Sequence, residues 1–487
     1  EITSQMVDTQ SWVRSFLNPK FAFESRWGYK KGGINIPPFF VPLNPCSPPN
    51  LPLKRETSAH PCRVKSEKGL FLLFLWNFTY LCSRKITIME SLKELYRIGS
   101  GPSSSHTMGP KRAAERFAER CRDVDAYRVT LYGSLAATGK GHLTDVAILS
   151  VLEPAAPTRI VWKPEVVLPF HPNGMLFEGL KGDEVVDSWT IYSVGGGALA
   201  NEASRLETPR SIYPLSTISE IKEWCYHEGK TFWEYVSDCE GPEIWDYLDT
   251  VWETMCATIQ RGLNNDGVLP GGLKVARKAS TYWVKSKSYT DSLSSRAKIY
   301  AYALATSEEN ASGGTVVTAP TCGSSGVMPA VLYHLSTSRN FLRIRILRAL
   351  ATAGLFGNVA KTNSSISGAE VGCQGEVGVA CAMAAAAACQ LFGGTPSQIE
   401  YAAEMGLEHH LGLTCDPVCG LVQVPCIERN AIAAARAFDA NAYATLSDGS
   451  HMVSFDKVVE VMNETGHALP SLYRETSEGG LAKRFKR

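Results

Sequence analysis

The chain has 487 residues, of which 44% are hydrophobic, so it can fill the cores of two to four domains. Its 49 basic and 48 acidic residues give a formal net charge of +1, which offers no electrostatic argument for a nucleic acid or an anionic membrane as partner. Fourteen cysteines in so long a chain, mostly in apolar or glycine-rich settings, do not resemble a disulfide framework. We therefore expect a protein of the reducing cytoplasm.

Residues 1–88 differ in composition from the rest of the chain. They contain a Pro-rich stretch without a repeat, and their longest apolar run, residues 70–82, is too short to span a bilayer and lies too far inside for a simple signal peptide. We expect a disordered extension or a segment foreign to the native protein. The alternative is an organelle-targeting extension, which basic residues such as Arg14 and Arg26 favour and early acidic residues disfavour.

From residue 89 to about residue 212 the pattern mixes strands and helices and predicts a first, α/β domain. The loop SSSHT is followed by Pro110 and an apolar helical face, so the loop lies just before a helix N-terminus, where free N–H groups attract an anion. Serine and threonine at such a position usually do no more than cap the helix. A strand is expected at residues 127–133, and His142 follows in a glycine-lined loop, where a lone histidine is more often structural than functional.

Two glycine-rich stretches of this domain could be mistaken for nucleotide sites. The residues from Gly133 to Lys140 lack the spacing and the Ser or Thr of a phosphate-binding loop, so we reject that reading. The three glycines at 195–197 lack the dinucleotide spacing and predict a turn between strands.

After about residue 212, helical periodicity replaces strand-like alternation, for example in residues 244–263, and predicts an all-helical domain over residues 213–487. An Ala-rich helix before Gly393 is apolar nearly all round and must be buried. Thr395, Pro396 and Gln398 predict the start of the next helix.

The cysteines of the helical region fall into two kinds. Cys381 and Cys389 lie inside the Ala-rich helix, where a thiol is ordinary core filling. Cys373, Cys415 and Cys426 lie beside Gly or Pro, at loop or helix-end positions from which three soft ligands could converge on zinc or an iron–sulfur cluster. Spacing alone does not choose between these metals.

Cys419 decides what such a site could do. It lies one residue further from Cys415 than a CxxC pair would place it. If Cys419 joined the other three cysteines, the site would be closed. If it stays out, one iron keeps an open position and can act as a Lewis acid.

Other polar residues of this region have plainer readings. His409 and His410 follow a helix and can simply hydrogen-bond to its last carbonyl oxygens. Glu404 and Glu408 form an acidic pair that we expect on a solvated or hydrogen-bonded face. Lys361 is not a convincing pyridoxal phosphate lysine, since nothing near it resembles that cofactor's phosphate cup.

The runs KTNSSISGAEVGCQGEVGVACAMAAA and GLTCDPVCGLVQVPCIERNA resemble the alpha region of iron–sulfur L-serine dehydratases, and GSGPSSSHTMGPKRAAERF with LYGSLAATGKGHLTD resembles their beta region. The resemblance covers roughly residue 90 to the end and implies an α+β fold in two domains. It implies a [4Fe-4S] cluster without pyridoxal phosphate, and L-serine as the substrate. The residues it implies for the cluster are Cys373, Cys415 and Cys426, and those it implies for the active site are His106 and His142.

The resemblance also guides the remaining expectations. Substrate-carboxylate contacts are expected from Ser104, Ser105 and Thr107, and the active chain is expected to be a homodimer that binds neither nucleic acid nor membrane. Relatives begin near Met89, so we expect the native start there. Cys419 stands where the family usually has glycine, and the chain lacks the cysteine-bearing tail of some relatives.

Serine dehydration needs a base for the Cα proton and help for the departure of hydroxide. A histidine with an unperturbed pKa near 6.5 can be that base, so we expect His142 or His106 in this role and the other as an orienting group. Because these histidines and the cysteines belong to different regions, the site must form where the two domains meet. A cysteine desulfidase of related fold, a redox sensor closed by Cys419 and a structural zinc protein are the alternatives.

Overall fold

The fold is known from a computed structural model that describes residues 89–201 and 211–485. The extension expected at residues 1–88 lies outside the described residues. Within the described ranges, no helix is both long and apolar enough to cross a membrane.

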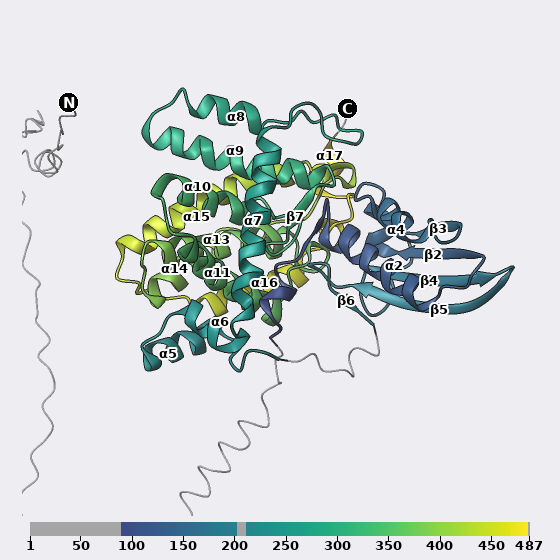
Figure 1. The fold of residues 1–487 in the computed structure, drawn as a ribbon, viewed down its shortest axis with the longest axis horizontal. Coiled ribbons are helices and arrows are strands. Elements are labelled where there is room, and N and C mark those ends of the chain that lie inside the picture. Colours follow the sequence, from purple (N-terminus) through teal and green to yellow (C-terminus); the bar gives the residue numbers. More distant parts are fainter. Residues whose placement is uncertain (1–88, 202–210, 486–487) are drawn as a thin grey trace, which may run out of the picture. The chain divides into compact units, whose positions relative to one another are not determined.

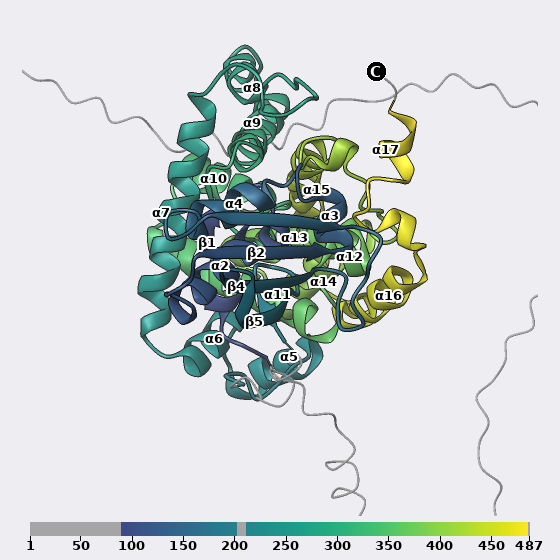
Figure 2. The ribbon, with the colours of Figure 1, turned by 90° about the vertical axis from the view of Figure 1, so that its right-hand side faces the viewer.

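The first domain is built on a five-stranded sheet with the strand order β3-β2-β4-β5-β6, in which only β2 and β3 run parallel (Figure 1). The neighbouring strands β2, β4 and β5 are seen side by side in Figure 2. The strands are β2 (Ala126–Tyr132), β3 (Thr158–Lys163), β4 (Gly174–Lys181), β5 (Glu184–Ser193) and β6 (Leu199–Ala200).

Helix α2 (Gly109–Arg120) packs on this sheet and on α4 (Thr144–Leu152). The ring of Phe117 lies 6.0 Å from that of Tyr127 and 5.5 Å from that of Phe177, measured between centroids. Helix α2 begins with Pro110 in its first turn and buries Ala113, Ala114 and Phe117, as the sequence predicted. The glycines at 195–197 form the predicted turn, between β5 and β6.

One local prediction for this domain was wrong. The SSSHT stretch, expected as a loop, forms the π-helical turn η2 (Ser104–Met108), which runs directly into α2. The stretch rejected as a phosphate-binding loop begins with the short helix α3 (Gly133–Thr138), for which no prediction was made. A helix of six residues between glycines carries too little periodicity to be read from sequence.

The second domain is helical, as predicted, and is centred on α13 (Val379–Leu391). All residues of α13 except Gln390 are buried, and the helix packs against α10, α11, α14 and α15. Cys381 and Cys389 are both fully buried there, which confirms their role in the core. The bounds of the longer helices of this domain are α5 (Ile218–Glu228), α6 (Phe232–Glu240), α7 (Glu243–Leu263), α8 (Ala279–Ser286), α9 (Asp291–Ala311), α10 (Val327–Arg339), α11 (Arg343–Asn363), α14 (Pro396–Glu408), α15 (Cys426–Leu446) and α16 (Phe455–Ala468).

Small residues let these helices come close together. A Cβ atom on Gly406 of α14 would lie 2.9 Å from the Cα atom of Ala382 in α13, so only glycine fits at this crossing. The predicted start of α14 is confirmed, since Thr395 and Gln398 form a capping box with Pro396 in the first turn.

The segment after Met89 belongs to the helical core. It forms η1 (Leu92–Glu94) and β1 (Ile98–Ser100), and β1 pairs antiparallel with β7 (Thr315–Val317). Met89, Leu92, Leu95 and Tyr96 are buried in the core of the helical domain. The α+β fold class is therefore confirmed, while residues 89–100, expected in the first domain, pack with the second.

Candidate active site

The three cysteines expected as metal ligands come from three turns of the helical domain. Cys373 lies between the short helix α12 (Gly368–Val371) and the π-helical turn η4 (Gln374–Gly378). Cys415 lies in the loop after α14, and Cys426 is the first residue of α15. Burial raises the pKa of the Cys373 thiol to about 11, and burial followed by neighbouring negative groups raises the pKa of Cys415 and Cys426. The charges of Cys373 and Cys426 act on Cys415, and the charge of Cys373 acts on Cys426, so the three thiols lie near one another.

The sulfurs of these cysteines do not lie at the spacing of a single-ion site. A tetrahedral zinc site with Zn–S bonds of about 2.3 Å holds its sulfurs about 3.8 Å apart. Among the described residues, the one set of three whose ligand atoms lie within 4.8 Å of one another is His106, His142 and Glu475. The three cysteines do not form such a set. The side chains pack closely against Gly368, because a Cβ atom there would lie 3.0 Å from the sulfur of Cys415 and 3.0 Å from Oε2 of Glu376. Three buried thiols fit the soft ligand set of an iron–sulfur cluster.

Arg429, one turn after Cys426 on α15, supplies positive charge to this space. Its Nη1 donates to the carbonyl oxygen of Thr414 at 2.7 Å, and its Nη2 donates to Oδ1 of Asp416 at 3.3 Å. It thereby holds the two neighbours of Cys415, and its charge lowers the pKa of Cys373 against the effect of burial. Arg429 was not predicted from the sequence, although it follows Cys426, an expected ligand, by three residues on a helix.

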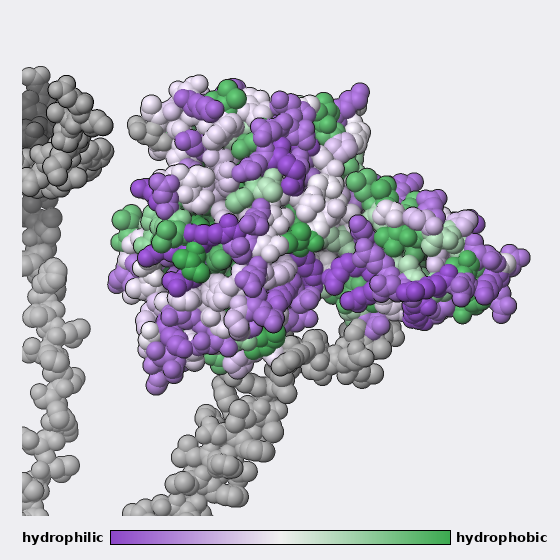
Figure 3. Space-filling view, in the orientation of Figure 1, coloured by the Kyte–Doolittle hydropathy of each residue, from purple (hydrophilic) through white to green (hydrophobic). Residues whose placement is uncertain are grey.

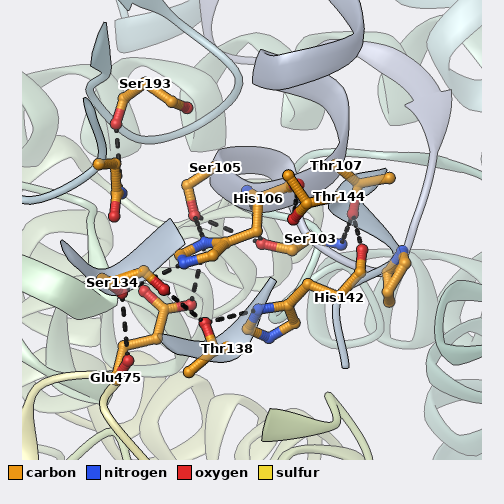
Figure 4. A network of polar contacts seen from close by, with 12 residues as sticks. Ser103, Ser105, His106, Thr107, Ser134, Thr138, His142, Thr144, Ser193 and Glu475 are labelled. Atoms are coloured by element: carbon orange, nitrogen blue, oxygen red, sulfur yellow. Dashed lines mark hydrogen bonds and ion pairs between the residues drawn. The ribbon is translucent and has the colours of Figure 1, made fainter. Parts of the chain in front are cut away.

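The two histidines lie together in the first domain (Figure 4). His106 is in the π-helical turn η2 and His142 is in the loop before α4, and their ring centroids are 4.5 Å apart. Both are fully buried. Burial lowers the pKa of His142 to about 4, and burial with the charge of His142 lowers the pKa of His106 well below its usual value. Both imidazoles are therefore neutral at neutral pH.

The hydrogen bonds around His142 fix which of its nitrogens carries the proton. The Thr138 hydroxyl donates to the carbonyl oxygen of Ser134 at 3.0 Å, so it has no proton left for His142. His142 Nδ1, 3.1 Å from that hydroxyl oxygen, must therefore be the donor. His142 Nε2 then carries a free lone pair, and it is buried with no partner among the described residues.

Both nitrogens of His106 are engaged by protein groups. The Ser134 hydroxyl donates to the carbonyl oxygen of Glu475 at 3.1 Å, so His106 Nε2, 3.2 Å away, donates to that hydroxyl oxygen. His106 Nδ1 is left to accept from the Ser105 hydroxyl at 2.9 Å. His106 is thus held at both ends, whereas one end of His142 is free.

The three hydroxyl residues expected to bind substrate are in different situations. The Thr107 hydroxyl donates to the carbonyl oxygen of His142 at 2.7 Å and so fastens the His142 loop. The Ser105 hydroxyl contacts His106, and no protein partner of the Ser104 hydroxyl is found in the described ranges. The N–H groups of Ser104 and Ser105 open the π-helical turn, where no preceding turn supplies carbonyl partners.

Glu475, which the sequence analysis did not single out, connects the histidines to the cysteines. Its Oε1 lies 3.5 Å from Nδ1 of His106, and its charge acts on Cys415 and Cys426. Its Oε2 is buried without a hydrogen-bond partner. Burial, with the charge of Glu376 as a second cause, raises the pKa of Glu475 well above its usual value.

Main-chain hydrogen bonds fix Glu475 in this position. The Cys415 N–H donates to the carbonyl oxygen of Tyr473 at 2.9 Å, and the Glu475 N–H donates to the carbonyl oxygen of Cys415 at 2.8 Å. The segment around Arg474 thus forms a parallel β-bridge with Cys415. This pairing puts Glu475 beside Cys415, one of the three buried cysteines.

Cys419 lies apart from the buried thiols. Its side chain is exposed, and its backbone has a φ of 56°, in the left-handed region that favours glycine. It is not among the groups whose charge acts on Cys373, Cys415 or Cys426. The next residue, Gly420, is in close contact with the His142 loop. A Cβ atom on Gly141 of that loop would lie 2.5 Å from the carbonyl oxygen of Gly420.

The remaining candidates lie outside this arrangement. His409 and His410 contact the carbonyl oxygens of Met405 and Gly406 at 3.0 and 2.7 Å, as expected for histidines that meet the last carbonyls of a helix. Lys361 Nζ is 2.6 Å from Oε2 of Glu90 in an ion pair.

Comparisons with known proteins match the two regions of the chain in turn. The family model described as serine dehydratase beta chain matches residues 91–162, and the model described as serine dehydratase alpha chain matches residues 183–482. The chain is 43% identical over 451 residues to L-serine dehydratase 1 of Escherichia coli, covering 81% of this chain and 99% of that protein. It is 42% identical over 447 residues to L-serine dehydratase of Streptomyces coelicolor, covering 80% and 98%. It is 37% identical over 451 residues to L-serine dehydratase of Helicobacter pylori, covering 81% and 99%. With both regions matched in order and nearly the whole length of these relatives covered, the chain belongs to the serine dehydratase family.

Proposed function

We propose that the chain is an L-serine ammonia-lyase that converts L-serine to pyruvate and ammonia with a [4Fe-4S] cluster held by Cys373, Cys415 and Cys426. The observation that carries the proposal is the single site in which Glu475 joins the buried His106 and His142 to these buried cysteines. The family and the names of the relatives support L-serine as the substrate.

The cluster would supply a Lewis acid for the substrate hydroxyl, a poor leaving group without such help. The buried thiols are the residues that would hold it, and Arg429 would offset part of its negative charge. An exposed Cys419 supports a cluster with one iron left open to substrate.

His142 is our choice for the base that removes the Cα proton. Its Nε2 is unprotonated, buried and without a protein partner, so a substrate C–H can approach it. As Nε2 takes the proton, the cation that forms keeps its Nδ1–H bond to the Thr138 oxygen. A base so placed contributes about 10² to 10⁴ in rate, or roughly 3 to 5 kcal/mol.

His106 is our choice for the positioning group. Because Ser105 and Ser134 engage both of its nitrogens, it is fixed beside His142 rather than free to take a proton. The open N–H groups of Ser104 and Ser105 at the start of η2 are the proposed site for the substrate carboxylate. Loss of the Cα proton and of hydroxide gives 2-aminoacrylate, which tautomerises and hydrolyses to pyruvate and ammonia.

The test uses the full chain purified without oxygen and reconstituted with iron and sulfide. We expect pyruvate release on addition of L-serine, together with a change in the electron paramagnetic resonance spectrum. An intact cluster that does not respond to L-serine and yields no pyruvate would refute the proposal. Sulfide release from L-cysteine without turnover of L-serine would replace it with a desulfidase.

Two matched variants separate the histidine roles. The His142→Gln variant should bind iron normally and lose about 10² to 10⁴ in kcat. The His106→Gln variant should also keep its iron but lose less kcat, with a larger rise in KM. The reverse order of kcat losses would contradict the choice of His142 as base.

A further inference from the structure

Two histidines and one carboxyl group of the site lie close enough to hold a single metal ion. One ligand atom each of His106, His142 and Glu475 lies within 4.8 Å of the other two, and all three side chains are buried. His106 Nδ1 and Glu475 Oε1 are 3.5 Å apart. In a tetrahedral site with metal–nitrogen bonds of about 2.0 Å, neighbouring ligand atoms lie about 3.3 Å apart, so this pair is already near the required spacing.

The hydrogen bonds of the two histidines match those of metal-binding histidines. Such a histidine almost always donates its other ring N–H to a fixed oxygen, which sets the tautomer and the ring orientation. His142 Nδ1 donates to the hydroxyl oxygen of Thr138 at 3.1 Å, and His106 Nε2 donates to that of Ser134 at 3.2 Å. Burial lowers the pKa of both rings, so the remaining nitrogens carry lone pairs without protons at neutral pH.

The groups that face one another in this site can all be released to a cation. His142 Nε2 and Glu475 Oε2 are buried with no hydrogen-bond partner among the described residues. His106 Nδ1 accepts from the Ser105 hydroxyl at 2.9 Å. That hydroxyl is also 3.3 Å from the hydroxyl oxygen of Ser103, so it can turn and donate there instead.

We propose that His106, His142 and Glu475 bind one borderline divalent cation such as Zn²⁺, and that the bound cation inhibits the chain by occupying the lone pair of His142. Two histidines and one glutamate are a ligand set that binds zinc with a fourth position left open. The nitrogen ligands favour such a cation over Mg²⁺ and Ca²⁺, which prefer oxygen. The charge of Glu376 acts on Glu475, and a cation at Glu475 offsets this repulsion.

Binding and inhibition depend on different premises. Binding needs the three side chains alone, and it uses none of the cysteines, so it does not require an empty cluster site. Inhibition rests on the proposed function, in which His142 Nε2 removes the Cα proton. The experiment therefore measures the bound metal and the pyruvate released as separate quantities.

The binding test uses the full chain reconstituted with iron and sulfide and then dialysed against micromolar Zn²⁺, with zinc and iron counted on the same samples. We expect one more zinc per chain in the wild type than in His142→Gln, with the iron content unchanged. Much of the face shown in Figure 3 is hydrophilic, and polar side chains at a surface can bind zinc weakly. The matched control is therefore His409→Gln, at an exposed histidine, which should bind as much zinc as the wild type.

Thr138 tests the arrangement without removal of a ligand. Thr138→Val keeps all three ligands but removes the acceptor of His142 Nδ1–H, so it should weaken zinc binding about 10- to 100-fold. Thr138→Ser keeps the hydroxyl and should bind zinc as the wild type does. Circular dichroism is measured on each variant, and Thr138→Val decides the question where His142→Gln does not fold.

The kinetic test adds Zn²⁺ to the same reconstituted chain. Zinc should raise the apparent KM for L-serine and leave kcat unchanged, because the substrate and the cation compete for His142 Nε2. Bound zinc that leaves pyruvate release unchanged would overturn the inhibitory role. Equal zinc in the wild type, His142→Gln and Thr138→Val, or zinc that enters only as iron is lost, would overturn the metal site. The extra zinc in a chain that releases no pyruvate would refute the proposed function and support the metal site.

Discussion

Thr138 offers the most specific test of the proposed base. Its hydroxyl oxygen accepts from His142 Nδ1 at 3.1 Å while its proton goes to the Ser134 carbonyl oxygen. The Thr138→Val substitution keeps the shape and removes this acceptor. When His142 Nε2 takes the substrate proton, the imidazolium then lacks its partner at Nδ1.

The expected fall in kcat follows from the loss of that one hydrogen bond. A hydrogen bond to a charged group contributes about 1.5 to 3 kcal/mol. If it is made mainly in the transition state, Thr138→Val should lower kcat by about 10- to 150-fold with little change in KM. The pKa of His142 should fall further, because the lost bond favoured the charged form, so the acidic limb of the pH–rate profile should move to lower pH.

The assay is pyruvate release at saturating L-serine, with iron content and circular dichroism measured on the same samples. Thr138→Ser keeps the hydroxyl and is the control; it should retain most of the activity and the wild-type acidic limb. A Thr138→Val enzyme within about threefold of wild-type kcat would refute the assignment of His142 Nε2 as the base.

Three further predictions concern the cysteine set, the tail and the buried histidines. Gly368→Ala should lower the iron content, because its Cβ atom would lie 3.0 Å from the Cys415 sulfur. Gly272→Ala is the control and should not lower it, because nothing lies within 4 Å of its Cβ atom. Equal iron content in both variants would contradict a cluster site beside Gly368. Glu475→Gln should keep iron but lower kcat by at least about tenfold if the carboxyl group acts on His106, and unchanged kinetics would exclude that role. Burial lowers the pKa of His334 to about 4, so the stability it provides is present above pH 6.5 and is lost as the pH falls toward 4. From pH 7.5 to 5, wild type should lose about 2 kcal/mol more unfolding free energy in urea than His334→Gln, and an equal loss would contradict a neutral buried His334.

Patterns set by local physics could be predicted from the sequence. The buried α13, the capping box of Thr395 and the core positions of Cys381 and Cys389 follow from composition and spacing within one helix. The cysteines proposed as ligands were indicated by the neighbouring Gly and Pro residues. These features need information only from residues a few positions apart.

Features that depend on packing between distant segments could not be predicted. Glu475 reaches its place through main-chain bonds to Cys415, and its carbonyl oxygen accepts from Ser134, 341 positions earlier in the chain. No periodicity in the tail indicates that a strand-like segment will pair there. Glu404 was expected on a solvated or hydrogen-bonded face because residues four positions apart share one face of a helix.

Glu475 was missed and Glu404 was misread, and both side chains are buried. In the described chain, Oε2 of Glu475 is buried without a partner, whereas the oxygens of Glu404 are not among the buried atoms that lack one. An unpartnered buried polar group costs about 1 to 3 kcal/mol, so a fold keeps one only where something else compensates. At Glu475 the proposed substrate and cluster would provide this compensation, next to the free lone pair of His142 and the buried thiols. Glu404 lines a cavity with Arg436 and Tyr443 and needs no such compensation.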